Sequence, residues 1–161
     1  ALLRAVEQAR QQVMESRQRE GEQLKEDILQ KLAGMTGNIG GIEERYPQMV
    51  GDYRKKLEDK VRELLADTNV DESRIATEVV IYADKICVDE ETVRLRSHIQ
   101  NMEEELLRGG NVGRKLDFIA QEMNREANTI LSKANDITVS NMAIDLKTEI
   151  EKIREQVQNI E

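Results

Sequence analysis

One apolar stripe at helical spacing limits what this chain can fold into more than any other feature. Between residues 113 and 134, apolar side chains recur every three or four positions, as one face of an α-helix requires; they are Leu116, Ile119, Ala120, Met123, Ala127, Ile130, Leu131 and Ala134. The chain has one Phe, three Tyr and no Trp, so it lacks the aromatic side chains that strands favour. The sequence therefore predicts an all-α protein.

The same periodicity predicts two units. Residues 1–70 are expected to form a long antiparallel helical hairpin, an arm, made of helices 1–33 and 42–66. Its turn is expected at the glycines of residues 34–41, which interrupt the pattern. Residues 71–161 are expected to form a compact helical bundle, whose helices are separated at Gly109-Gly110 and at Asn135-Asp136.

Composition excludes several functional classes. No apolar run approaches the roughly 20 residues of a membrane span. The only cysteine, Cys87, forms no internal disulfide, which fits a reducing cytoplasm. The chain lacks a Rossmann glycine fingerprint, a phosphate loop, a zinc knuckle and an RNA-recognition aromatic pair. We therefore expect a cytoplasmic protein with no membrane contact and no small-molecule organic cofactor.

Charge gives a mixed indication. The net charge of −8 opposes nucleic-acid binding, but binding depends on where charges lie. Residues 113–135 alone have a positive balance, with four basic and three acidic side chains. On that helix Glu122 and Glu126 lie one turn apart among basic and polar residues. Such a face is consistent with a salt-bridged surface, or with a site that holds a divalent metal and phosphates.

Three segments carry a resemblance to a known family. Residues 113–129, continued by Ser132-Lys133, are similar to the signature of the YicC/YloC family of bacterial endoribonucleases. Residues 89–98, which end in Ser97-His98, resemble the acidic-Arg-Leu-Ser-His segment of that family, and residues 151–161 resemble its C-terminus. The resemblance is dense over about residues 75–161 and looser before them. It implies the C-terminal helical portion of such an enzyme, in a fragment that lacks the N-terminal domain.

The resemblance also implies an activity and a site. It implies a metal-dependent endoribonuclease that cleaves phosphodiester bonds in RNA, with Mg²⁺ or Mn²⁺ as cofactor. The candidate catalytic residues are His98, Glu122 and Glu126, and the candidate metal ligands are Glu91, Glu122 and Glu126. The candidate RNA-phosphate contacts are Arg94, Arg114, Lys115, Arg125 and Lys133.

The expected partners are RNA and further copies of the same chain. The thin apolar seams and the polar stretch from Glu15 to Gln23 leave little core for one chain, so we expect a homo-oligomer. The resemblance implies a ring. Two alternatives stay open, namely a helical oligomerisation scaffold without enzymatic activity and an RNA-binding regulator that does not cleave.

Overall fold

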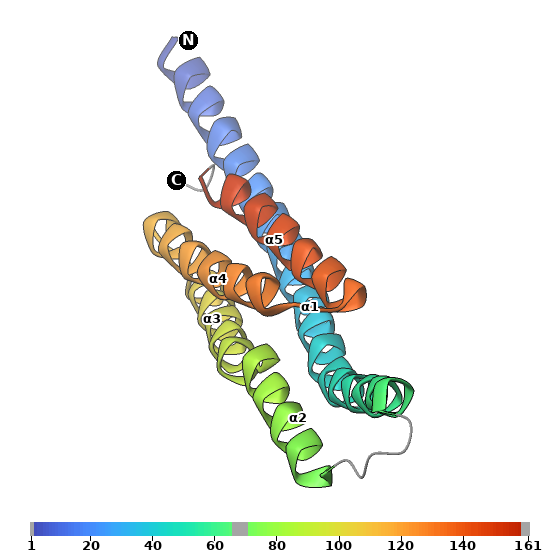
Figure 1. Cartoon of the computed structure of the whole chain (residues 1–161). Helices are drawn as coiled ribbons and strands as arrows, with labels where there is room; N and C mark the ends of the chain where they lie inside the picture. The colour runs from blue at the N-terminus through green and yellow to red at the C-terminus, as the bar shows by residue number, and fades with distance from the viewer. Residues whose placement is uncertain (1, 66–70, 159–161) are drawn as a thin grey trace.

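The computed structural model describes residues 2–65 and 71–158, and residues 1, 66–70 and 159–161 lie outside the description. The described chain consists of five α-helices (Figure 1), which are α1 (Leu2–Leu65), α2 (Glu72–Ile86), α3 (Asp89–Arg108), α4 (Gly113–Lys133) and α5 (Ile137–Val157). No strand occurs among these residues. The predicted all-α class is therefore confirmed. The last three residues of the C-terminal motif lie outside the described part.

The predicted hairpin is wrong, because α1 continues as one helix of 64 residues. The glycines at positions 34, 37, 40 and 41 were expected to make a turn. Instead, Leu32, Met35, Ile39 and Ile42, which follow the helical repeat through the same stretch, are almost fully buried. Their burial outweighs the cost of glycine in a helix, about 1 kcal/mol each relative to alanine. The predicted helix end at Ala66 and the predicted boundary at residue 70 lie outside the described residues.

The long helix is bent, and its two ends differ. Its last part, drawn in green in Figure 1, runs at an angle to the rest. Pro47 lies inside the helix, and proline is the usual cause of such a change of direction. At the other end, residues 3–23 are exposed and extend beyond the other helices (Figure 1). The middle of α1 therefore carries its contacts with the bundle.

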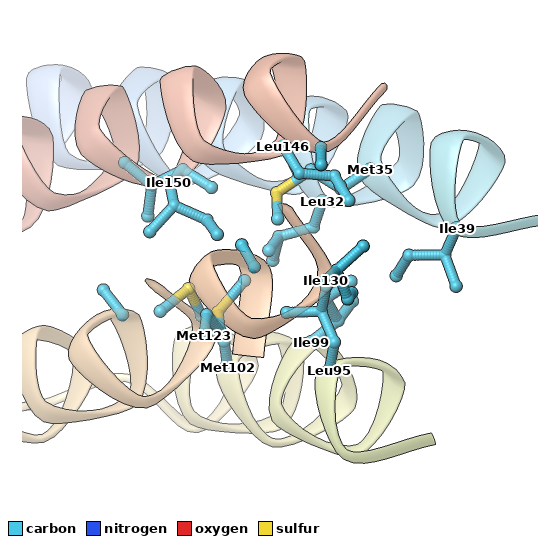
Figure 2. Packing of buried hydrophobic residues seen from close by; sticks show 14 of the residues in the cluster. Leu32, Met35, Ile39, Leu95, Ile99, Met102, Met123, Ile130, Leu146 and Ile150 are labelled. Atoms are coloured by element: carbon cyan, nitrogen blue, oxygen red, sulfur yellow. The ribbon is translucent and has the colours of Figure 1, made fainter. Parts of the chain in front are cut away.

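One hydrophobic core joins all five helices. In Figure 2, Leu32 and Met35 of α1 point toward Leu146 of α5 and Ile130 of α4. The fully buried large side chains are Ile28, Leu32, Met35, Ile39, Ile42, Leu95, Met102, Leu116, Met123, Ile130, Leu146 and Ile150. The apolar stripe of residues 116–130 thus forms the inner face of α4, as its spacing predicts.

Polar contacts fix α1 at the edge of this core. Arg96 of α3 donates to both carboxylate oxygens of Glu43, at 3.2 and 2.8 Å. The Tyr46 hydroxyl donates to the Ala83 carbonyl oxygen at 2.6 Å. A side chain at Gly41 would come within 2.9 Å of the Met142 Cε atom, so glycine allows α5 to approach there. Among the described helices, none has the length and apolar character that a membrane span requires.

Candidate functional site

Helices α3 and α4 form an antiparallel pair whose edge is lined by charged side chains. Residues 109–112 connect the two helices, and three ion pairs cross between them. Glu91 pairs with Lys133 at 3.0 Å, Arg94 with Glu126 at 3.0 Å, and Glu105 with Lys115 at 2.7 Å. We call this edge the polar seam, and it consists of Glu91, Arg94, His98, Glu105, Lys115, Glu122, Glu126 and Lys133.

The register of the polar seam places His98 beside Glu122. His98 lies one helical turn after Arg94 on α3, and Glu122 lies one turn before Glu126 on α4. Because the helices are antiparallel and Arg94 contacts Glu126, His98 and Glu122 lie at the same level. Both are partly buried. The predicted catalytic residues His98, Glu122 and Glu126 are therefore neighbours along one edge.

His98 differs from the other residues of the polar seam because its side chain is not engaged by a neighbour in the described part of the chain. Within the described residues its imidazole forms no hydrogen bond and no ion pair. The nearest acidic group by register, Glu122, accepts a hydrogen bond from Arg125 of its own helix at 3.3 Å. An imidazole without a fixed partner can accept or donate a proton at a bound ligand.

Three carboxylates of the polar seam are almost removed from solvent. Glu91, Glu105 and Glu126 are exposed by only 5%, 6% and 6%. Buried carboxylates need counter-charges. Arg94 supplies a counter-charge to two of these three carboxylates. Its Nε atom lies 3.0 Å from Glu126 and its second terminal nitrogen 3.5 Å from Glu91. Arg94 thus joins the acidic groups of both helices.

The network is incomplete at Glu91. Its Oε1 atom contacts both Lys133 and Arg94, whereas its buried Oε2 atom has no hydrogen-bond partner in the described structure. Lys133 also donates to the Cys87 carbonyl oxygen at 3.1 Å, which holds the ammonium in place. An unpaired buried carboxylate oxygen reduces stability.

Ion pairing also shifts the pKa values of this edge. The hydrogen bond to Glu126 raises the pKa of Arg94 above its ordinary value. The hydrogen bond from Lys115 lowers the pKa of Glu105. Both shifts favour the charged forms, so Arg94 and Glu105 keep their charges at neutral pH.

The predicted phosphate contacts do not gather into one patch. Arg94 and Lys133 lie near Glu91, while Lys115 lies near Glu105 toward the other end of the polar seam. Along α4 the distance from Lys115 to Lys133 is about 27 Å, at about 1.5 Å per residue. Arg114 and Arg125 are exposed at the surface of the same helix. The five cations are therefore spread along the length of α4 and onto α3, over more than one face of α4.

The predicted metal ligands are held by cations in this chain. Glu91 and Glu126 contact Arg94, and Glu122 contacts Arg125. Across the described ranges, no group of three or more histidine, cysteine or acidic side chains is placed to hold a metal ion. The geometry of the single chain therefore does not fit the predicted metal set of Glu91, Glu122 and Glu126. Metal binding stays a prediction.

Sequence reasoning overlooked Glu105. It lies seven residues after His98, nearly two helical turns, and so continues the same face. It is buried and also pairs with Arg108 at 2.6 Å. The seven-residue spacing of Glu91, His98 and Glu105 indicates that Glu105 shares their face. Because residues 103–105 are all glutamates, the sequence does not single out Glu105 among them.

Comparison with known proteins identifies the family. The C-terminal region of YicC-like endoribonucleases matches residues 42–161. A protein of Clostridioides difficile named probable endoribonuclease YicC is 47% identical over 161 residues, which cover 99% of this chain and 55% of the relative. A protein of the same name from Haemophilus influenzae is 38% identical over 145 residues, 90% of this chain and 50% of the relative. The chain thus spans about half the length of these relatives. It belongs to the family of YicC-like endoribonucleases, as their C-terminal region.

Proposed function

We propose that this chain is the C-terminal part of a cytoplasmic endoribonuclease and that the polar seam binds and cleaves RNA. The observation that carries the proposal is the register of α3 and α4, which brings His98 to the level of Glu122, one turn from Glu126 and Arg94. The names of the two relatives support an RNA substrate.

His98 is proposed to transfer the proton in phosphodiester cleavage. Cleavage requires removal of a proton from the attacking hydroxyl, neutralisation of the phosphate oxygens and a proton for the leaving oxygen. Glu122 is proposed to orient the His98 imidazole from the facing helix. Arg94 and Lys133 are proposed to bind the phosphate, with Lys115, Arg114 and Arg125 holding neighbouring phosphates along α4.

We also propose that RNA cleavage requires a divalent cation, and this requirement can be tested separately. Mg²⁺ or Mn²⁺ would neutralise phosphate charge, a role that Arg94 and Lys133 can share. Because both cations contact the carboxylates proposed as ligands, a metal at Glu91 would compete with Lys133. Titration of activity with Mn²⁺ after treatment with EDTA measures the requirement.

The second partner that we propose is another copy of the same chain. Leu3, Val6 and Val13 are more than half exposed and recur at helical spacing on the part of α1 that extends beyond the bundle. An apolar row of this kind is covered when helices of several copies pair, and the resemblance implies a ring. Light scattering after gel filtration gives the oligomer mass, and a monomer at micromolar concentration would contradict the proposal.

The test of the catalytic proposal is His98→Ala in the longer protein that carries this region. A structured RNA is incubated with Mn²⁺, and the cleavage rate is followed on a gel. We expect a loss of about 10²- to 10⁴-fold, the usual contribution of general acid–base catalysis. Gln100→Ala serves as the matched control, because Gln100 is exposed on the same helix.

The result separates the nuclease from the two alternatives. If His98→Ala, Glu122→Ala and Glu126→Ala all keep the rate of the unmodified protein, the polar seam is not the active site. RNA binding without cleavage under any metal condition favours the regulator. Neither binding nor cleavage favours the scaffold, in which the ion pairs of α3 and α4 serve packing alone.

A further inference from the structure

A cavity outside the polar seam lies where α1, α2 and the α4–α5 connection meet. Its volume is about 280 Å³, and it is lined by Arg45, Met49, Asp52, Tyr53, Lys56, Tyr82, Asn135 and Asp136. This volume is close to the lower end of small-molecule sites, which span about 300–1,000 Å³. A cavity of this size is comparable to one nucleotide and is far smaller than a duplex.

Two aromatic rings form part of the wall. The rings of Tyr53 and Tyr82 have centroids 3.8 Å apart and planes inclined by 12°. They come from different helices and are two of only three tyrosines in the chain. Both are partly buried, so neither ring is wholly enclosed. Bases of single-stranded RNA stack on tyrosine faces of this kind.

The charges of the cavity favour a base in its interior and a phosphate at its rim. Arg45 lies 3.0 Å from Asp136 and 3.3 Å from Asp52, so its charge is compensated inside the cavity. Asn135 offers both a donor and an acceptor to the polar edge of a base. Lys56 is exposed and forms no ion pair within the described residues, which leaves its ammonium for a phosphate.

The cavity also adjoins one end of the polar seam. Asn135 follows Lys133 by two residues, so the two positions are at most about 7 Å apart along the chain. Lys133 contacts Glu91 and the Cys87 carbonyl oxygen, and Cys87 follows Tyr82 by five residues. A single strand whose base enters the cavity can therefore continue past Lys133 toward His98.

We propose that the Tyr53–Tyr82 cavity binds one base of single-stranded RNA by stacking on Tyr53 and so positions the strand along the polar seam. This inference rests on the proposed RNA function and adds to it a second contact that selects unpaired RNA. A duplex keeps its bases stacked on one another, so it gains nothing from the cavity.

The test measures binding of a single-stranded ten-nucleotide oligoadenylate by fluorescence anisotropy, with EDTA present. Tyr53→Leu is expected to weaken binding at least about fivefold, since stacking of one base on an aromatic ring is worth 1 kcal/mol or more. Tyr53→Phe keeps the ring and is expected to bind like the unmodified protein. Phe118→Leu, which removes an exposed aromatic ring from α4, is the matched control.

Tyrosine emission gives an independent readout. The chain has no tryptophan, so adenosine monophosphate that stacks in the cavity is expected to quench tyrosine fluorescence directly, and less in Tyr53→Leu. Unchanged oligoadenylate affinity in Tyr53→Leu would overturn the inference, and so would equal binding of an oligomer without bases.

The two proposals fail in different ways. If cleavage depends on His98 while Tyr53→Leu binds normally, the cavity proposal fails and the catalytic proposal stands. If Tyr53→Leu weakens binding while His98→Ala cleaves normally, the catalytic proposal fails and the cavity proposal stands. Thermal unfolding of each variant identifies a loss of affinity that comes from unfolding, and Tyr53→Phe then decides between stacking and packing.

Discussion

Two helix interfaces of this molecule differ in the polarity of their buried side chains. One is the contact of α1 with the bundle, and the other is the polar seam between α3 and α4. The buried face of α1 is apolar from Ile28 to Met49, and its ion pairs, such as Arg96 with Glu43, lie at the margin. The polar seam instead buries three glutamates and leaves one of their oxygens without a partner. Both interfaces join neighbouring helices, but among the described residues only the polar seam buries acidic side chains.

This difference indicates that the polar seam contributes less to the free energy of unfolding than an apolar interface of the same size would. A buried ion pair is often no better than apolar side chains of similar size, and removing one partner is costly. Leu95, Met102, Leu116 and Met123 show that α3 and α4 already share an apolar core. The acids beside that core are therefore unnecessary for packing, which is why we place the chemistry there.

Leu32→Ala is expected to have the largest effect, because it opens a cavity at the centre of the core. Leu32 is fully buried, and truncation of such a leucine costs about 2–5 kcal/mol in the free energy of unfolding. Urea denaturation followed by circular dichroism measures the loss. Gln12→Ala, on the exposed part of the same helix, should change it by less than about 0.5 kcal/mol. Equal effects of the two substitutions would contradict the assignment of the buried face.

Lys133→Met tests the polar seam and is expected to have a smaller effect. It removes one of the two cations at Glu91, and we expect a loss of about 1–3 kcal/mol, because Arg94 remains and Lys133 is itself partly exposed. The double variant with Glu91→Gln should recover part of the loss. Lys60→Met, at an exposed pair with Glu63, should leave the urea midpoint unchanged. No recovery in the double variant would show that Glu91 does not depend on Lys133.

The sequence predicted these two interfaces unequally. The apolar periodicity of residues 116–130 was sufficient to predict the inner face of α4, because burial depends on spacing. Pairing Arg94 with Glu126 depends on the register between two helices, which no local pattern encodes. His98 became the leading candidate through the family resemblance, whereas Glu122 and Glu126 also stand out by their spacing on one face of the helix. The Tyr53–Tyr82 stack joins residues of separate helices, so no sequence pattern indicates it.

The error at residues 34–41 has a specific physical source. The glycine spacing predicts a turn, although Leu32, Met35 and Ile39 continue the helical repeat across it. Local propensity is worth about 1 kcal/mol per glycine, whereas burial of each large side chain is worth about 1.5–3 kcal/mol. The tertiary contacts with α5 and α3 therefore decide the conformation, and they are not visible in a window of eight residues.

Gly37→Ala sharpens this point with a modest gain. A methyl group at Gly37 meets no atom within 4 Å, so alanine should stabilise the helix by about 0.5–1 kcal/mol. Gly41→Ala should gain less, because its methyl group would lie 2.9 Å from the Met142 Cε atom and that side chain must move. Thermal unfolding of the two variants gives the comparison. Destabilisation by Gly37→Ala would favour a turn over a continuous α1.

Acid is expected to act through individual ion pairs at the margin of α1, and the effect of one pair should be the smallest. The hydrogen bond from Arg45 lowers the pKa of Asp136 below its ordinary value of 3.8. A carboxyl group whose pKa is lower in the folded state stabilises the fold above its unfolded pKa, and the contribution disappears as pH falls through the folded value. The free energy of unfolding should therefore decline below about pH 4, and less steeply in Arg45→Met.

Urea titrations at neutral pH and at about pH 3 give the two slopes, and identical slopes would mean that this pair contributes nothing to the fold. Because Asp136 also accepts from the Val139 amide at the start of α5, a residual slope in Arg45→Met is expected from that cap alone.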